Sequence, residues 1–431
     1  MEGHVSPELL AGVVFALLIL GYSLFVSGLQ RLLITAPLVF VVIGWIIGSA
    51  LEPLGEAGGA EAVLGLAEIT LVLILFHDAA SVKPREVEGD RGTIARLLLI
   101  GFPVTVLLGW LAAQVVFPGL PVVMALLLAA ALAPTDAGLG APTILNPVVP
   151  QRVRRLLNVE SGLNDGLATP VVLFAVAVIA GAEGITAGES LVDAVVDLAI
   201  GLTAGVVVGA GGGMLLGWST RSLMSSQGSR ALAVLMLPLL AYGSASLFGG
   251  NGFVAAFVAG TSFAGASHWV VGREDPLELT EQLAKPLGYG VWLVFGISAA
   301  PVVANQVGWR ELVYALLALT VLRMLPVALS LLRSGFRVQS VLFIGWFGPR
   351  GLASIVFALI ALESLEADAD LERVLATIMV TVLLSIIAHG FSAEPLARRY
   401  GAWVDREQPP AELQSSTEPR CRDQRLWQVD A

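Results

Sequence analysis

Charged residues are scarce in this chain. Only 13% of its 431 positions are Asp, Glu, Lys or Arg, whereas 56% are hydrophobic, and the mean hydropathy is +0.83. A water-soluble domain with so few charges would lack the polar surface that keeps it in solution. Apolar runs of about twenty residues recur from Pro7 to Leu396, long enough to cross roughly 30 Å of hydrocarbon as helices. The composition therefore predicts a polytopic α-helical membrane protein.

Cysteine and histidine are almost missing. The single cysteine, Cys421, excludes a disulfide within one chain, and the four histidines are spread over positions 4, 77, 268 and 389. This leaves neither a His/Cys cluster for a transition metal nor a nucleophile–base constellation, so we expect no enzyme and no cofactor. No basic, aromatic surface for nucleic acid is visible. His77 and His389 lie near predicted helix ends, where a histidine needs no special role.

Polar breaks divide the chain into about thirteen candidate transmembrane helices. Basic residues fall almost entirely in alternate loops, which predicts an outside N-terminus and a cytoplasmic C-terminus in the cell membrane. Residues 1–401 are the predicted transmembrane domain, and residues 402–431, which are acidic and polar, are the predicted disordered cytoplasmic tail. The spans are expected near 7–28, 32–51, 61–80, 93–117, 121–147, 152–181, 190–218, 229–248, 251–268, 282–303, 310–332, 338–361 and 373–396.

Two of these spans carry a proline in mid-membrane. The fifth is interrupted at Ala133-Pro134-Thr135-Asp136 and the twelfth at Gly348-Pro349-Arg350-Gly351. A proline removes a backbone hydrogen bond and opens the helix. Because the twelfth span comes seven positions after the fifth, an odd offset, the two run in opposite directions. This favours two inverted six-helix repeats, with a site where the broken helices cross.

Ionisable side chains lie deep in several spans. The basic ones are Arg323 and Arg350, and the acids are Glu68, Asp78, Asp136, Glu160 and Asp165. A charge at the bilayer centre costs at least a few kcal/mol, so it is usually paired or lines a wet path. Two arginines cannot neutralise all these acids, and the remaining acids must bind protons or cations. Since burial disfavours the charged form and a cation favours it, proton and cation would compete for the same carboxylate.

The sixth span offers suitable ligands. Ser161 and Asp165 are four residues apart and share one helix face, with Glu160 and Asn164 about 100° round the helix. Their oxygens suit sodium or lithium. The opened backbone at Thr135 and Asp136 could add carbonyl groups and a second carboxylate.

Four stretches of the chain, taken together, resemble the electroneutral NhaP-type branch of monovalent cation/proton antiporters, which are relatives of the animal sodium/proton exchangers. The resemblance covers nearly the whole membrane region in the same order. The stretches are Pro134-Thr135-Asp136, Glu160-Ser161-Gly162-Leu163-Asn164-Asp165, Gly345-Trp346-Phe347-Gly348-Pro349-Arg350-Gly351 and His389-Gly390-Phe391-Ser392-Ala393-Glu394-Pro395-Leu396.

The resemblance implies a homodimer in the lipid membrane, with a mobile core domain moving the ion past a dimerisation domain. Asp165 would bind proton and cation in turn, with Asp136, Thr135 and Ser161 completing the site. Glu160 would pair with Arg323, and Arg350 would stabilise the helix crossing. Asn164 in place of a second aspartate implies electroneutral exchange.

Some alternatives stay open on the sequence alone. A third acid is expected near the site, and Asp78 is the candidate, with Glu68 as the alternative. Ala137 follows Asp136 where many relatives have proline, so Pro134 and Gly138 would shape the break instead. The transported ion could be Na+, Li+ or K+, and a cation-coupled solute symporter is the competing function.

Overall fold

The computed structural model describes residues 7–31, 34–50, 59–82, 89–181, 187–222, 224–267, 275–414 and 416 of the chain. Within these residues the structure contains helices and no strands. Nine of the described helices are long and apolar enough to cross a membrane, and four shorter apolar helices accompany them. Their positions match the spans expected from the sequence. An all-α membrane fold is thus confirmed, and the number of crossings remains a prediction.

Among the described residues, nine of the thirteen predicted spans each consist of one continuous helix. They are α1 (Pro7–Arg31), α2 (Ala36–Ala50), α3 (Gly59–Ser81), α8 (Gln151–Ala180), α9 (Ala187–Arg221), α10 (Gln227–Leu247), α11 (Gly252–Ala266), α12 (Glu278–Gln306) and α17 (Ala369–Glu407).

The other four predicted spans are each divided. The fourth consists of α4 (Arg91–Arg96), a π-helical turn η2 (Leu97–Gly101) and α5 (Phe102–Val116). The fifth contains α6 (Val122–Ala131) and the short α7 (Ala141–Ile144), and the eleventh contains α13 (Trp309–Leu319) and α14 (Val321–Ser330). The twelfth contains α15 (Val338–Trp346) and α16 (Leu352–Ser364). The breaks expected at Pro134 and Pro349 are therefore present, and the break at Thr320 is an addition.

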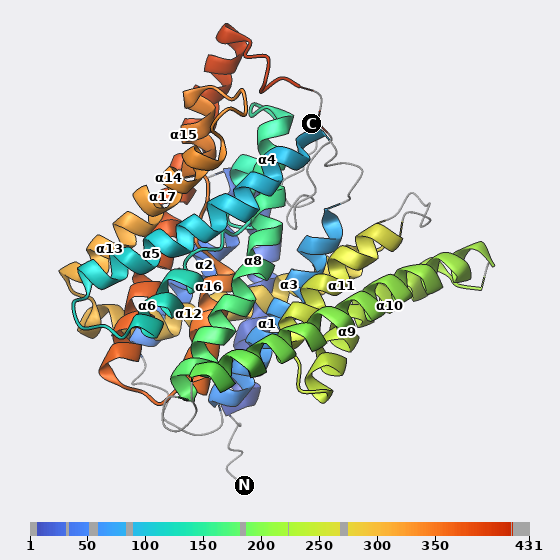
Figure 1. Cartoon of the computed structure of the whole chain (residues 1–431), viewed down its shortest axis with the longest axis horizontal. Helices are drawn as coiled ribbons and strands as arrows, with labels where there is room; N and C mark the ends of the chain where they lie inside the picture. Colours follow the sequence, from blue (N-terminus) through green and yellow to red (C-terminus); the bar gives the residue numbers. More distant parts are fainter. Residues whose placement is uncertain are drawn as a thin grey trace.

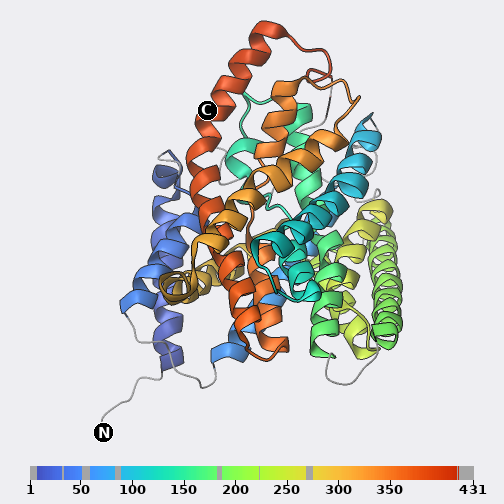
Figure 2. The ribbon, with the colours of Figure 1, turned by 60° about the vertical axis from the view of Figure 1, so that its left-hand side comes forward.

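The helices form two sets, a bundle and a flanking set. The bundle comprises α4 to α8 with η2 and α13 to α17, and the flanking set comprises α1 to α3 and α9 to α12; each set has most of its contacts within itself. In Figure 1 the helices α9 to α11 extend to the right of the bundle, and Figure 2 shows the bundle between α1–α2 and α9–α11. The two sets touch where α3, α11 and α9 meet α8 and where α12 meets α16 and α17. This boundary positions the candidate site.

A stripe of glycines brings α9 against α11 in the flanking set. A methyl group added at Gly201 or Gly205 would come within 2.6 Å of the carbonyl oxygen of Asn251 or Ala255, respectively. The stripe therefore allows the close helix approach that small residues permit in membranes.

The C-terminal segment corrects the predicted domain boundary at residue 401. Helix α17 continues through Glu407, and the Glu412 side chain is buried against the start of α15. Its Oε1 accepts hydrogen bonds from Arg337 N at 2.8 Å and from Ser340 Oγ at 2.6 Å. Residues 402–414 are thus ordered against the bundle, and the predicted disorder of residues 417–431 lies outside the described residues.

Candidate functional site

The two proline-containing breaks cross inside the bundle. Asp136 N donates to Pro349 O at 2.9 Å, which joins the two extended segments directly. The Asp136 carboxylate accepts from Gly138 N at 2.8 Å and Leu139 N at 3.1 Å through Oδ1, and from Leu352 N at 2.8 Å through Oδ2. Leu352 is the first residue of α16, so this carboxylate caps the positive end of that half-helix.

Arg350 has the complementary role at the negative helix ends. Its Nη1 donates to Ala133 O at 2.7 Å and Pro134 O at 3.0 Å, just beyond α6, and its Nη2 donates to Ala318 O at 3.3 Å, near the end of α13. These carbonyls have lost their intrahelical donors at the breaks, and a guanidinium satisfies several of them at once. Arg350 is only 1% exposed, and three such bonds offset the cost of burying its charge.

Two glycines of the twelfth span permit this crossing. A methyl group at Gly348 would lie 3.0 Å from both Thr135 Cγ2 and Arg323 Cζ, and one at Gly351 would overlap the Asp136 carboxyl group. Any other residue at Gly351 would therefore displace the carboxylate that caps α16.

Side chains of α8 join the crossing from the other side. Thr135 Oγ1 lies 2.8 Å from Ser161 Oγ, and Asn164 Nδ2 donates to the same Thr135 Oγ1 at 2.8 Å. The Asn164 Oδ1 accepts from Thr135 N at 3.2 Å, so asparagine holds both the backbone and the hydroxyl of the break. Asp165 is the next residue on α8 and is 4% exposed. The structure thus brings Thr135, Ser161 and Asn164 together, and Asp165 follows them on α8 as a buried residue.

Glu160 and Arg323 form a two-point ion pair between α8 and α14. Arg323 Nη1 lies 2.5 Å from Glu160 Oε1 and Nη2 lies 2.8 Å from Oε2, with both side chains about 5% exposed. This is the pairing that the family resemblance implied. A bidentate carboxylate–guanidinium contact satisfies both charges within the protein interior.

The two candidate third acids of α3 lie in different surroundings. Asp78 packs against α8: a methyl group at Gly162 would be 3.4 Å from Asp78 O, and Asp78 Oδ1 lies 3.0 Å from His77 Nδ1. Glu68 instead accepts a hydrogen bond from Tyr242 OH of α10 at 3.3 Å. Of the two, Asp78 is therefore the one beside the α8 motif.

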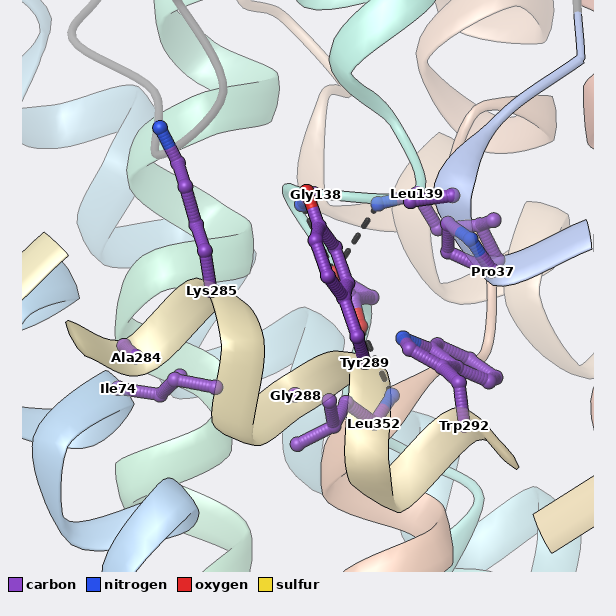
Figure 3. Close-up of a pocket in the computed structure, with 12 residues that line it drawn as sticks. Pro37, Ile74, Gly138, Leu139, Ala284, Lys285, Gly288, Tyr289, Trp292 and Leu352 are labelled. Carbon is purple, nitrogen blue, oxygen red and sulfur yellow. Dashed lines mark hydrogen bonds between the residues drawn. The ribbon is translucent and has the colours of Figure 1, made fainter. Parts of the chain in front are cut away.

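A small cavity reaches the crossing from the boundary between the bundle and the flanking set. Its volume is about 50 Å³, and Asp136, Gly138, Leu139 and Leu352 line it on the bundle side. Opposite them are side chains of α12, and Figure 3 shows Tyr289 beside Gly138 and Leu352. A single water molecule needs about 10–15 Å³ of such space, so the cavity has room for a partly hydrated ion. Asp136 is the acid that lines it, and Asp165 is not part of the lining.

Two residues of α17 also contact the break: His389, for which the sequence indicated no special role, and Ser385, which no motif marked. His389 is 2% exposed and lies 2.9 Å from Trp346 O, and Ser385 is fully buried and accepts from Arg350 N. In the part of the chain that the structure describes, no group of three or more His, Cys, Asp or Glu side chains gathers to hold a metal ion. The site is instead an oxygen-rich junction of two broken helices with α8.

Comparison with known proteins places this geometry in a family. Residues 11–399 match the family model of the transmembrane sodium/hydrogen exchanger. The K(+)/H(+) antiporter NhaP of Alkalimonas amylolytica is 28% identical over 408 residues, which is 91% of this chain and 68% of that protein. The Na(+)/H(+) antiporter of Schizosaccharomyces pombe is 29% identical over 329 residues, 67% of this chain and 68% of that protein.

A solved structure shares the fold. The sodium proton antiporter MjNhaP1 from Methanocaldococcus jannaschii at pH 8 superposes with a TM-score of 0.66 at 19% sequence identity, covering 91% of this chain and 99% of that chain. The family match covers most of this sequence, and the fold agrees with it. The chain belongs to the sodium/hydrogen exchanger family.

Proposed function

We propose that this protein exchanges a monovalent cation for a proton, one for one, and that the two compete for Asp165. The observation that carries the proposal is the position of this buried carboxylate, one helical turn after Ser161, whose hydroxyl bonds to Thr135 at the crossing. A carboxylate in such a place is charged only with a cation nearby and otherwise takes up a proton.

The neighbouring residues have separate roles in this proposal. Thr135 and Ser161 supply hydroxyl oxygens, and Asn164 holds the Thr135 backbone in place. Asp136 attracts the cation to the cavity that it lines while it caps α16. Asp78 adds negative charge from α3. The charge of Glu160 is compensated by Arg323, so that the pair is structural rather than transporting.

Electroneutral exchange follows from the charge count at the motif. Asn164 cannot ionise, whereas an aspartate there would add a second proton-binding group. One carboxylate that releases one proton for each cation moves no net charge. Sodium or lithium is the proposed ion, and potassium is the alternative. Relatives named as Na(+)/H(+) antiporters and as K(+)/H(+) antiporters are both similar to this chain.

The proposal also includes a homodimer in the cell membrane, with the N-terminus outside and the C-terminus in the cytoplasm. The first residues of α1 and the last of α17 lie at opposite ends of the molecule (Figure 2), as an odd number of crossings requires. Cysteine labelling from either side of intact cells, at residues introduced near Pro7 and Gln408, tests the orientation. Crosslinking in membranes tests the dimer.

The experiment that tests the exchange is proton movement in vesicles containing the purified protein. Adding sodium, lithium or potassium chloride, with no organic solute, should dissipate an imposed pH gradient, and clamping the membrane potential should leave the rate unchanged. Asp165→Asn should abolish the response, whereas the matched control Asp193→Asn, at an exposed position of α9, should retain it. Normal exchange by the Asp165→Asn protein would refute the assignment, and a response that requires an organic solute would favour the symporter.

A further inference from the structure

In the buried segment between α15 and α16, the backbone lacks hydrogen bonds that a continuous helix would provide. Helix α15 ends at Trp346, with Phe347 N still donating to Phe343 O at 3.0 Å, and α16 begins at Leu352, with Gly351 O accepting from Ile355 N at 3.4 Å. The residues between them, Gly348 to Arg350, are outside both helices. Buried carbonyl and N–H groups of this kind need partners within the protein. Trp346 O accepts one bond from Gly348 N at 2.8 Å, inside the segment itself.

Helix α17 supplies the other partner of Trp346. His389 Nε2 lies 2.9 Å from Trp346 O, which can only accept, so the ring binds this carbonyl in the tautomer that carries its proton on Nε2. The other ring nitrogen, Nδ1, lies 2.9 Å from the carbonyl oxygen and 3.2 Å from Oγ of Ser385, one turn earlier on α17. The imidazole also stacks on the Trp346 ring at 5.2 Å between centroids.

The same α17 turn holds the far end of the segment. Ser385 Oγ accepts a hydrogen bond from Arg350 N at 2.7 Å. Both ends of the break, Trp346 O and Arg350 N, are thus fixed to two side chains that are one helical turn apart on a single helix. Whether or not Nδ1 carries a proton, its partner is Ser385 on the same helix. The Nε2 bond is therefore the one that connects the imidazole to the break.

We infer that His389 and Ser385 form a clamp that positions the cation site, with His389 as its positioning residue. The clamp fixes the backbone from Trp346 to Arg350. The Arg350 side chain and the backbone of Leu352 then contact the site directly. The Arg350 guanidinium binds Ala133 O and Pro134 O, and Leu352 N binds Asp136 Oδ2. Moving this segment would therefore move Thr135 and Asp136. The inference rests on the proposed function and adds a role outside the ion ligands.

The test compares two amides at position 389. The amide nitrogen of glutamine can reach the place of Nε2 and donate to Trp346 O, whereas asparagine reaches only as far as Nδ1. We expect His389→Asn to raise the apparent KM for the transported cation about threefold to tenfold, the effect of one lost buried hydrogen bond. His389→Gln should stay within about twofold of the wild type by the same reasoning. The measurement is cation-dependent proton movement in vesicles with sodium, lithium and potassium, together with melting temperatures in detergent.

A purely structural histidine would give a different result. It would lower the melting temperature and the amount of active protein without changing KM, or would affect both amides equally, and either outcome overturns the inference. If His389→Asn fails to insert, Ser385→Ala carries the same test against Ser354→Ala, which removes a buried hydroxyl that has no hydrogen-bond partner. Ser385→Ala should raise KM and Ser354→Ala should not. Absence of exchange by the wild type would refute the proposed function, whereas wild-type exchange with unchanged variants would refute only the clamp.

Discussion

Removing one partner of the Glu160–Arg323 ion pair should destabilise the bundle strongly. The pair is about 5% exposed on both sides and makes two short contacts, so each substitution leaves its partner buried without its counter-charge. Breaking a buried pair in this way typically costs about 3–5 kcal/mol. Glu160→Gln should be the more damaging change, because the Arg323 guanidinium cannot lose its proton, whereas the Glu160 carboxylate can gain one after Arg323→Gln.

The cost can be converted into a melting temperature. Unfolding entropy is about 2.1 cal/mol/K per residue, or about 0.9 kcal/mol/K for the 431 residues, which gives a decrease of about 3–6 °C. The decrease is larger if helices persist in detergent after the bundle separates, because less entropy is then gained. The assay heats the purified protein in detergent and measures the fraction that stays monodisperse at each temperature.

A double-mutant cycle decides whether the pair itself is responsible. The variant carrying both Glu160→Gln and Arg323→Gln has no uncompensated charge, so it should melt above Glu160→Gln. Arg398→Gln serves as a control, because it breaks an ion pair with Glu394 in which the arginine side chain is 74% exposed, and such pairs contribute about 0–1 kcal/mol. Additive effects of the two single changes, or a decrease no larger than that of the control, would refute the reasoning.

Two further predictions follow from close contacts. Gly351→Ala should abolish transport while the protein still inserts, because the new methyl group would displace the Asp136 carboxyl group; Gly390→Ala, which meets no atom within 4 Å, should transport normally in the same vesicle assay. Glu412→Ala should release the C-terminal segment from Arg337 N at a cost of about 1–3 kcal/mol, detected as faster proteolysis after α17 with exchange retained.

The helix breaks and the buried charges could be predicted because each has a local chemical cause. Prolines at positions 134 and 349 remove backbone donors wherever they occur in a span. The charges of Arg323 and Arg350 were visible in mid-span, and it was the family resemblance that indicated Arg323 as the partner of Glu160. The break at Thr320 had no such signal, since neither glycine nor proline stands there. Its freed carbonyl at Ala318 is satisfied by Arg350 from a distant span, a contact that only the tertiary fold creates.

His389 shows the opposite limit of sequence reasoning. Its position near the end of the predicted span 373–396 indicated no special role. In the structure α17 continues through Glu407, and His389 is buried in the interior. Glu412 was misjudged for a related reason: a polar segment was expected to be disordered, yet its carboxylate has partners at the start of α15. In both cases a partner far away in sequence decided the environment.

The glycine stripe of α9 has a mechanical consequence. At Gly201 and Gly205 the backbones of α9 and α11 are in close contact, and sliding one helix along the other would force main-chain atoms together. The two helices therefore behave as one rigid unit. The α9–α11 pair is therefore a rigid part of the flanking set, and it meets the bundle where both helices contact α8.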